Sequence, residues 1–195
     1  MRTRLVALTI GFGLLVMVPA TYRSPVPPAP RLVTLGDSIT AASNPCGAGW
    51  PTFLSKPPFH NAGVGGNTTG AMLHRLTTDV LAYRPTDVTI LGGTNDIYNG
   101  VPLSTSMSNL AAIIDAVHGI GATPWLLTLP PFPGHEDTVA AYNAALAPLA
   151  LAHGARLINI YPALAADWAG YSCDGVHPTG SGAAVIARLV QSFVQ

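Results

Sequence analysis

Short apolar runs alternate along this chain with longer segments in which apolar residues recur every three or four positions. The short runs contain β-branched and aromatic residues and end at turn-forming residues, as is typical of buried strands. The longer segments have the periodicity of amphipathic helices. We therefore predict strands over 32–35, 59–62, 87–91, 124–129 and 155–160, and helices over 50–54, 69–83, 104–118, 138–153 and 178–194.

Strands that alternate with helices favour a parallel sheet covered on both faces. The prediction is one α/β domain, a three-layer α/β/α sandwich with five strands. Pro148 is expected either to kink its helix or to mark an earlier end, and residues 161–175 are expected to form a loop. In the closing helix, the residues expected to pack inward are Ala184, Ile186, Leu189, Val190 and Phe193.

The first 20 residues have the layout of a secretory signal peptide. Arg2 and Arg4 precede a mostly apolar run, and Val18-Pro19-Ala20 places small residues at the −3 and −1 positions of a cleavage site. The run is short for a membrane span, and an uncleaved anchor is the alternative. Residues 21–30 carry four prolines and are expected to be an extended linker before a domain over 31–195.

Charge is sparse and balanced along the 195 residues. The formal net charge is zero, 9% of the residues are charged, and Lys56 is the one lysine. No basic run is available to follow a phosphate backbone, so nucleic acid is a poor candidate partner. We expect a soluble, secreted monomer.

The two cysteines, Cys46 and Cys173, are consistent with an oxidising compartment. Cys46 follows the turn Gly36-Asp37-Ser38, and Cys173 directly precedes the motif Asp174-x-x-His177. Both motifs are candidates for one active site, so a disulfide would join two loops of that site. The alternative is a pair of free thiols.

The first strand ends at Gly36-Asp37-Ser38, and ligands of α/β domains bind at the carboxyl ends of strands. Ser38 is a candidate nucleophile there, expected at the positive end of a following helix, although a helix cap is its simpler role. A serine nucleophile needs an imidazole to take its proton and a carboxylate to hold the ring. Asp174-Gly175-Val176-His177 offers both within one turn, whereas Asp37 or a backbone carbonyl could orient the ring instead.

Acyl transfer also needs hydrogen-bond donors for the developing oxyanion. The candidates are the Ser38 N–H, an N–H of the turn 63–66 and the Asn95 side chain. Gly66 could serve only its turn, and Asn95 could be an Asx-turn residue, a role more expected for Asp96.

With these motifs in place, the chain resembles the SGNH (GDSL-like) hydrolases over nearly all of 31–195. Thr40 and Ala41 depart from the way many relatives continue the serine block. The resemblance implies a flavodoxin-like five-stranded sheet, no metal and no cofactor. It also implies Ser38 as nucleophile, His177 as base and Asp174 as its partner, with Ser38, Gly66 and Asn95 as the oxyanion hole. The four signature blocks are Gly36-Asp37-Ser38, Asn61-x-Gly63-x-x-Gly66, Gly93-x-Asn95-Asp96 and Asp174-x-x-His177-Pro178.

The resulting hypothesis is a secreted serine hydrolase that cleaves carboxylic esters through an acyl-serine intermediate. The near-minimal length favours short-chain or O-acetyl carbohydrate esters over long acyl chains. The alternatives are a lipase, lysophospholipase or thioesterase acting on longer chains, an acyltransferase, and a non-catalytic carbohydrate-binding module on the same fold. The substrate is thus a small-molecule, lipid or carbohydrate ester.

Overall fold

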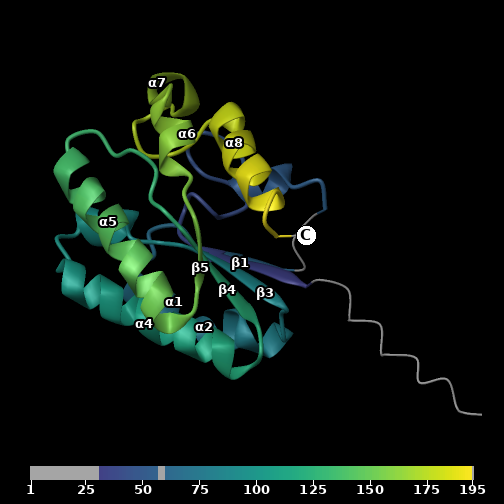
Figure 1. Cartoon of the computed structure of the whole chain (residues 1–195). Coiled ribbons are helices and arrows are strands. Elements are labelled where there is room, and N and C mark those ends of the chain that lie inside the picture. Colours follow the sequence, from purple (N-terminus) through teal and green to yellow (C-terminus); the bar gives the residue numbers. More distant parts are fainter. Residues whose placement is uncertain (1–30, 57–59, 195) are drawn as a thin grey trace, which may run out of the picture.

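The computed structural model describes residues 31–56 and 60–194. The predicted signal peptide (1–20) and linker (21–30) lie outside the described residues, as does Phe59 at the start of the second predicted strand. The five strands are all parallel, in the order β2-β1-β3-β4-β5. This flavodoxin-like order confirms the predicted α/β fold (Figure 1). The strands are β1 (Leu32–Gly36), β2 (His60–Gly63), β3 (Asp87–Leu91), β4 (Thr123–Leu127) and β5 (Arg156–Ile158).

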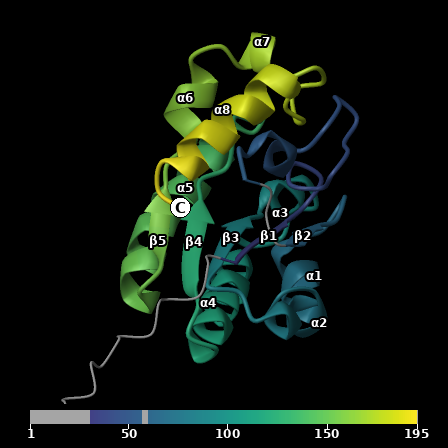
Figure 2. The ribbon, with the colours of Figure 1, turned by 90° about the vertical axis from the view of Figure 1, so that its right-hand side faces the viewer.

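The three central strands are covered on both faces. In β1, β3 and β4 every residue after the first is buried, which is why these segments are almost continuously apolar rather than alternating. One helical layer contains α1 (Thr69–His74), α2 (Leu76–Asp79), α4 (Leu103–Gly119) and α5 (Glu136–His153). The opposite layer contains η1 (Trp50–Phe53), α6 (Tyr161–Ala165), α7 (Trp168–Tyr171) and α8 (Gly180–Gln191), as Figures 1 and 2 show.

The helix predicted over 69–83 is interrupted. Thr68 caps α1 by accepting a hydrogen bond from Ala71 N, as expected. At Arg75 the backbone leaves the helical region (φ −97°, ψ 3°), and the segment continues as α2 and the short 3₁₀ helix η2 (Leu81–Tyr83). Apolar periodicity persists through the break, so the pattern alone did not reveal it.

Pro148 does not end its helix. It lies inside α5, which runs on to His153. Pro148 and Ala144, whose carbonyl loses its partner, are both exposed. Water can therefore satisfy that carbonyl, which lowers the cost of proline here.

The segment expected to be a loop, 161–175, contains α6 and α7. Their buried residues Leu164 and Trp168 join the core, so tertiary packing stabilises helices that are too short to form alone. In α8, Ile186 and Val190 are fully buried as predicted, whereas Phe193 is 53% exposed and lies beyond the helix end.

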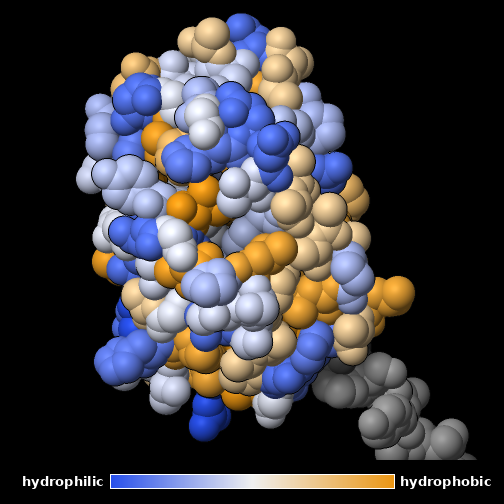
Figure 3. Space-filling model, turned by 90° about the vertical axis from the view of Figure 1, so that its left-hand side faces the viewer, coloured by the Kyte–Doolittle hydropathy of each residue, from blue (hydrophilic) through white to orange (hydrophobic). Residues whose placement is uncertain are grey.

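A space-filling view from the side at which the strands end shows a hollow near its centre, bordered by both hydrophobic and hydrophilic residues (Figure 3). Within 31–56 and 60–194, none of the helices combines the length and the apolar character needed to cross a bilayer.

Candidate active site

Ser38 lies immediately after β1, in a turn rather than at the start of a helix. Ala41 N donates to Asp37 O at 2.9 Å, which closes a single turn, and the next helical element is η1, at Trp50. The expectation that Ser38 lies at the start of a helix is therefore wrong. The turn is instead fixed by the Asp37 side chain, whose Oδ1 accepts from Ile39 N at 2.9 Å.

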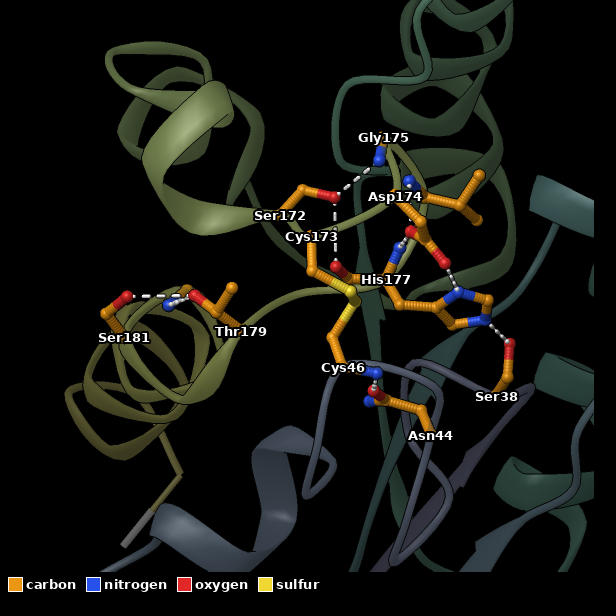
Figure 4. Close-up of a disulfide and its surroundings, with 12 residues drawn as sticks. Ser38, Asn44, Cys46, Ser172, Cys173, Asp174, Gly175, His177, Thr179 and Ser181 are labelled. Atoms are coloured by element: carbon orange, nitrogen blue, oxygen red, sulfur yellow. Dashed lines mark hydrogen bonds and ion pairs between the residues drawn. A yellow bond between two sulfur atoms is a disulfide. The ribbon is translucent and has the colours of Figure 1, made fainter.

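His177 lies between α7 and α8, in a turn that Asp174 organises. Asp174 Oδ1 accepts from Val176 N at 2.9 Å and from His177 N at 2.7 Å. Its Oδ2 lies 2.7 Å from His177 Nδ1, and His177 Nε2 lies 2.9 Å from Ser38 Oγ (Figure 4). One imidazole thus joins a carboxylate to a hydroxyl across 139 residues of sequence. The carboxylate on Nδ1 is Asp174 rather than Asp37.

The hydrogen bonds to Asp174 keep it ionised. Burial alone would raise the pKa of this carboxyl, but the hydrogen bonds from the backbone and ring of His177 and from Val176 N outweigh it, so the pKa lies below its usual 3.8. An ionised carboxylate on Nδ1 fixes the tautomer in which Nε2 can accept a proton from a hydroxyl.

A disulfide between Cys46 and Cys173 connects the serine side to the histidine side (Figure 4). This confirms the predicted pairing. Cys173 immediately precedes Asp174, and Cys46 lies in the loop that follows Ser38, where Asn44 Oδ1 accepts from Cys46 N at 2.8 Å. The bond therefore tethers the Asp174 turn to the serine loop.

Ser172 braces the same turn from inside. Its Oγ accepts from Gly175 N and donates to His177 O, both at 2.9 Å. Trp168 Nε1 donates to Gly175 O at 3.0 Å. These bonds connect the turn to α7 and, through Trp168, to the core.

The three candidate oxyanion donors come from three strand ends. Among the residues that the structure describes, no hydrogen-bond acceptor meets Ser38 N or Gly66 N. Gly66 has φ +77°, a conformation that favours glycine. Asn95 Nδ2 donates to Asn67 O at 3.0 Å, and its second contact, to Asp37 Oδ2, is 3.4 Å long. That contact is beyond usual hydrogen-bond lengths, so one amide hydrogen is only weakly held.

Close backbone contact brings the Gly66 loop against the serine turn. A Cβ on Gly63 would lie 2.3 Å from Ala41 N, so no larger residue fits there without displacing the backbone. Asn61 spans the same junction: its Nδ2 donates to Thr40 O at 2.9 Å and its Oδ1 accepts from Gly63 N at 2.9 Å.

Asp37 is 1% exposed. Burial raises its pKa from 3.8 to about 6, against the opposing effects of the Ile39 N–H and the positive charge that His177 can carry. The carboxyl of Asp37, with its raised pKa, therefore belongs to the residue next to the candidate nucleophile, Ser38.

A mostly apolar pocket of about 300 Å³ lies between α3 (Thr94–Tyr98), which carries Asn95, the start of α4 and the start of α5. Neither Ser38 nor His177 is among its lining residues, which are Asp96, Ile97, Val101, Leu103, Asp137, Thr138, Ala141 and Tyr142.

The sequence model of the GDSL-like lipase/acylhydrolase family matches residues 34–185 of this chain. The chain belongs to this family. No curated protein matches it in sequence.

Several solved structures share the fold of this family member. A lipase/acylhydrolase from Enterococcus faecalis is 25% identical, with 86% of this chain and 98% of that one covered and a TM-score of 0.70. A GDSL-like lipase from Bacteroides thetaiotaomicron is 24% identical (84% and 87% covered, TM-score 0.71). A catalytic mutant of an acetylxylan esterase from Geobacillus stearothermophilus is 19% identical (84% and 93% covered, TM-score 0.74).

The sequence did not predict that Asp96 and Arg75 connect separate segments around the site. Asp96, expected in an Asx turn, is 1% exposed and accepts from Thr69 N and Ser106 Oγ, both at 2.8 Å, so it connects α3 to α1 and α4. Asn95 likewise lies in α3, where a turn was expected. Arg75 was not singled out at all, because two of its three partners, Gly36 and Asn67, lie on other segments and only Asp79 is local.

Proposed function

We propose that this GDSL-like acylhydrolase hydrolyses carboxylic esters, with Ser38 as nucleophile, His177 as general base and Asp174 as the carboxylate that orients the ring. The observation that carries the proposal is the continuous path from Asp174 Oδ2 through both ring nitrogens of His177 to Ser38 Oγ, with contacts of 2.7 and 2.9 Å. These lengths suit proton transfer from the hydroxyl to Nε2.

In the first half-reaction Ser38 Oγ attacks the ester carbonyl carbon while His177 Nε2 takes the hydroxyl proton. The tetrahedral oxyanion collapses, the bond to the alcohol oxygen breaks, and the alcohol leaves with that proton. In the second half-reaction a water gives its proton to Nε2 and attacks the acyl carbon. The bond from the acyl carbon to Ser38 Oγ then breaks and Oγ takes the proton back from Nε2, which releases the free acid and regenerates Ser38.

We assign the oxyanion hole to Ser38 N, Gly66 N and Asn95 Nδ2. Support comes from the two backbone N–H groups, which meet no acceptor among the described residues, and from the weakly held amide hydrogen of Asn95. Preorganised donors of this kind stabilise charge only as it develops.

The substrate we propose is a short-chain ester, including O-acetyl groups on carbohydrate, outside the cell. The support is the acetylxylan esterase among the solved structures of the same fold and a disulfide of the kind that oxidising compartments favour. The predicted signal peptide is consistent with export.

The experiment is fluorophosphonate labelling of the purified protein, followed by mass spectrometry. We expect one adduct, on Ser38, which Ser38→Ala and His177→Ala abolish and which Ser104→Ala, at an exposed serine, leaves unchanged. Folded protein that forms no adduct and hydrolyses no ester would refute the hydrolase and favour a carbohydrate-binding module.

A longer acyl substrate is the second candidate, because the apolar pocket bordered by α3, the helix that carries Asn95, offers about 300 Å³ to an acyl chain. Rates for acetyl to palmitoyl esters would distinguish the two. Ala141 lines the pocket, so Ala141→Trp should fill it, whereas Ala144→Trp, at an exposed position of the same helix outside the pocket lining, is the matched control. If only Ala141→Trp removes a preference for long chains, the pocket holds the acyl group; if acetyl esters are fastest and both variants keep that rate, the short-chain proposal stands.

A further inference from the structure

Arg75, at the break between α1 and α2, makes hydrogen bonds that its own helix does not need. Its side chain is 14% exposed. Nη2 donates to Gly36 O at 2.9 Å, and Nε donates to Asn67 Oδ1 at 2.6 Å. The remaining bond, from Nη1 to Asp79 Oδ2 at 3.0 Å, is an ordinary i,i+4 ion pair.

The two distant acceptors belong to segments that carry the proposed oxyanion donors. Gly36 O closes β1, two residues before Ser38, and also accepts from Val64 N at 3.1 Å. Asn67 follows Gly66, and its carbonyl accepts from Asn95 Nδ2 at 3.0 Å. One guanidinium group therefore connects the serine segment to the Gly66 segment directly, and to Asn95 through Asn67.

The close contact at Gly63 anchors the start of the Gly66 loop, but packing does not fix residues 64–66 themselves. Residues 64–66 are exposed, and a Cβ built on Gly66 would meet nothing within 4 Å. Hydrogen bonds therefore have to set the direction of the Gly66 N–H. The planar fork of arginine donates in fixed directions, so it can hold two acceptors in one relative geometry, as a lysine ammonium cannot.

We infer that Arg75 is a positioning residue for the oxyanion hole, which holds Gly66 N and Asn95 Nδ2 in register with Ser38. The inference rests on the proposed ester hydrolysis. The ion pair with Asp79 does not explain the arrangement, because an exposed i,i+4 pair contributes little and requires no buried guanidinium.

The test compares Arg75→Ala and Arg75→Lys with wild type on an acetyl ester. We expect kcat to fall about 100-fold in Arg75→Ala, because a donor displaced by about 1 Å loses most of its effect. KM should change little. The Ki of a boronic acid, whose serine adduct places an oxygen in the hole, should rise by a similar factor. Arg75→Lys should show a smaller change in the same two quantities.

The controls are Arg188→Ala, at an exposed arginine of α8, and Asp79→Asn, which removes only the ion pair. Both should keep wild-type kcat. Circular dichroism and thermal unfolding confirm the fold, and if Arg75→Ala does not fold, Arg75→Lys decides alone.

The inference is overturned if kcat and the boronic acid Ki of Arg75→Ala stay within about threefold of wild type, or if its kcat falls while its Ki is unchanged. The same criteria apply to Arg75→Lys where Arg75→Ala does not fold. A wild-type protein that neither labels nor hydrolyses esters would instead refute the proposed function, so the two failures are distinguishable.

Discussion

Ser38 and His177 meet at 2.9 Å, yet the segments that carry them are held by different means. The serine turn extends β1 at the centre of the sheet, and its Asp37 is 1% exposed. The histidine turn projects between two helices, and the side chain of its Asp174 is 37% exposed. Burial and backbone pairing place the nucleophile, whereas the base depends on hydrogen bonds within its own turn and on one disulfide.

The same contrast shows in the two aspartates. Burial raises the pKa of Asp37 to about 6, while hydrogen bonds from His177 and Val176 outweigh burial and lower that of Asp174. Near neutral pH the folded protein stabilises the ionised form of Asp174, whereas ionisation of the buried Asp37 lowers the free energy of unfolding. Hydrogen bonds thus let the histidine side keep a negative charge, which burial opposes on the serine side.

The largest expected effect comes from the histidine side. Asp174→Asn keeps an oxygen for the two backbone N–H groups but loses the acceptor for His177 Nδ1. We expect kcat to fall about 10⁴-fold with the fold retained, as for a triad whose tautomer is wrong. Steady-state kinetics measures it, with Asp167→Asn, at the N-cap of α7, as the control. A loss below about tenfold would mean that Asp174 does not orient the ring.

The second-largest effect is expected from removal of the disulfide between Cys46 and Cys173. Replacing both cysteines by serine opens a link between positions 127 residues apart, for which loop entropy gives an upper figure of about 5 kcal/mol in the free energy of unfolding. Chemical denaturation measures the change, and kcat should fall as the histidine turn loosens while the serine side stays packed. Unfolding that is insensitive to the substitution would show that the tether contributes nothing to stability.

The smallest of the three effects tests the serine side. Folded Asp37 keeps its proton up to about pH 6, whereas unfolded Asp37 releases it near 3.8. The unfolded chain therefore loses its proton first as pH rises, and stability falls between about pH 4 and 6 by about 3 kcal/mol at most. Above about pH 6 the whole loss of stability that ionisation of Asp37 causes is present.

Asp37→Asn should remove this fall and so be more stable than wild type at pH 7 to 8. The measurement is the difference in unfolding free energy between the two proteins across pH, because Asp174, whose lowered pKa acts in the opposite direction, then cancels. Parallel pH curves would show that Asp37 is not the titrating group.

Local sequence patterns predicted most of the strands and helices. The strand segments and the three motifs after β1, β2 and β3 follow from period and turn residues, which act over a few positions. The order of the strands was implied by the resemblance to the SGNH hydrolases, and the fourth motif, Asp174-x-x-His177, lies between α7 and α8 rather than at a strand end. Relations between distant segments did not follow. Arg75 interrupts a helix to reach Gly36 and Asn67, and Asp96 bonds Thr69 and Ser106 across two helices.

The expected helix after Ser38 failed for a related reason. Its turn is set by Asp37 Oδ1 on Ile39 N and by the contact of Gly63 with Ala41, and the second of these depends on a neighbouring strand. The oxyanion and triad roles, the monomeric state and the export of the chain stay predictions.

The disulfide also bears on how the domain matures. The chain has two cysteines, so one intramolecular pairing is possible and no wrong bridge can trap the chain or need an isomerase to reshuffle it. The partners are adjacent in the fold but 127 residues apart in the sequence, in the loop after β1 and in the turn before α8. Oxidation is therefore expected to come late, as a lock on a domain that has already assembled.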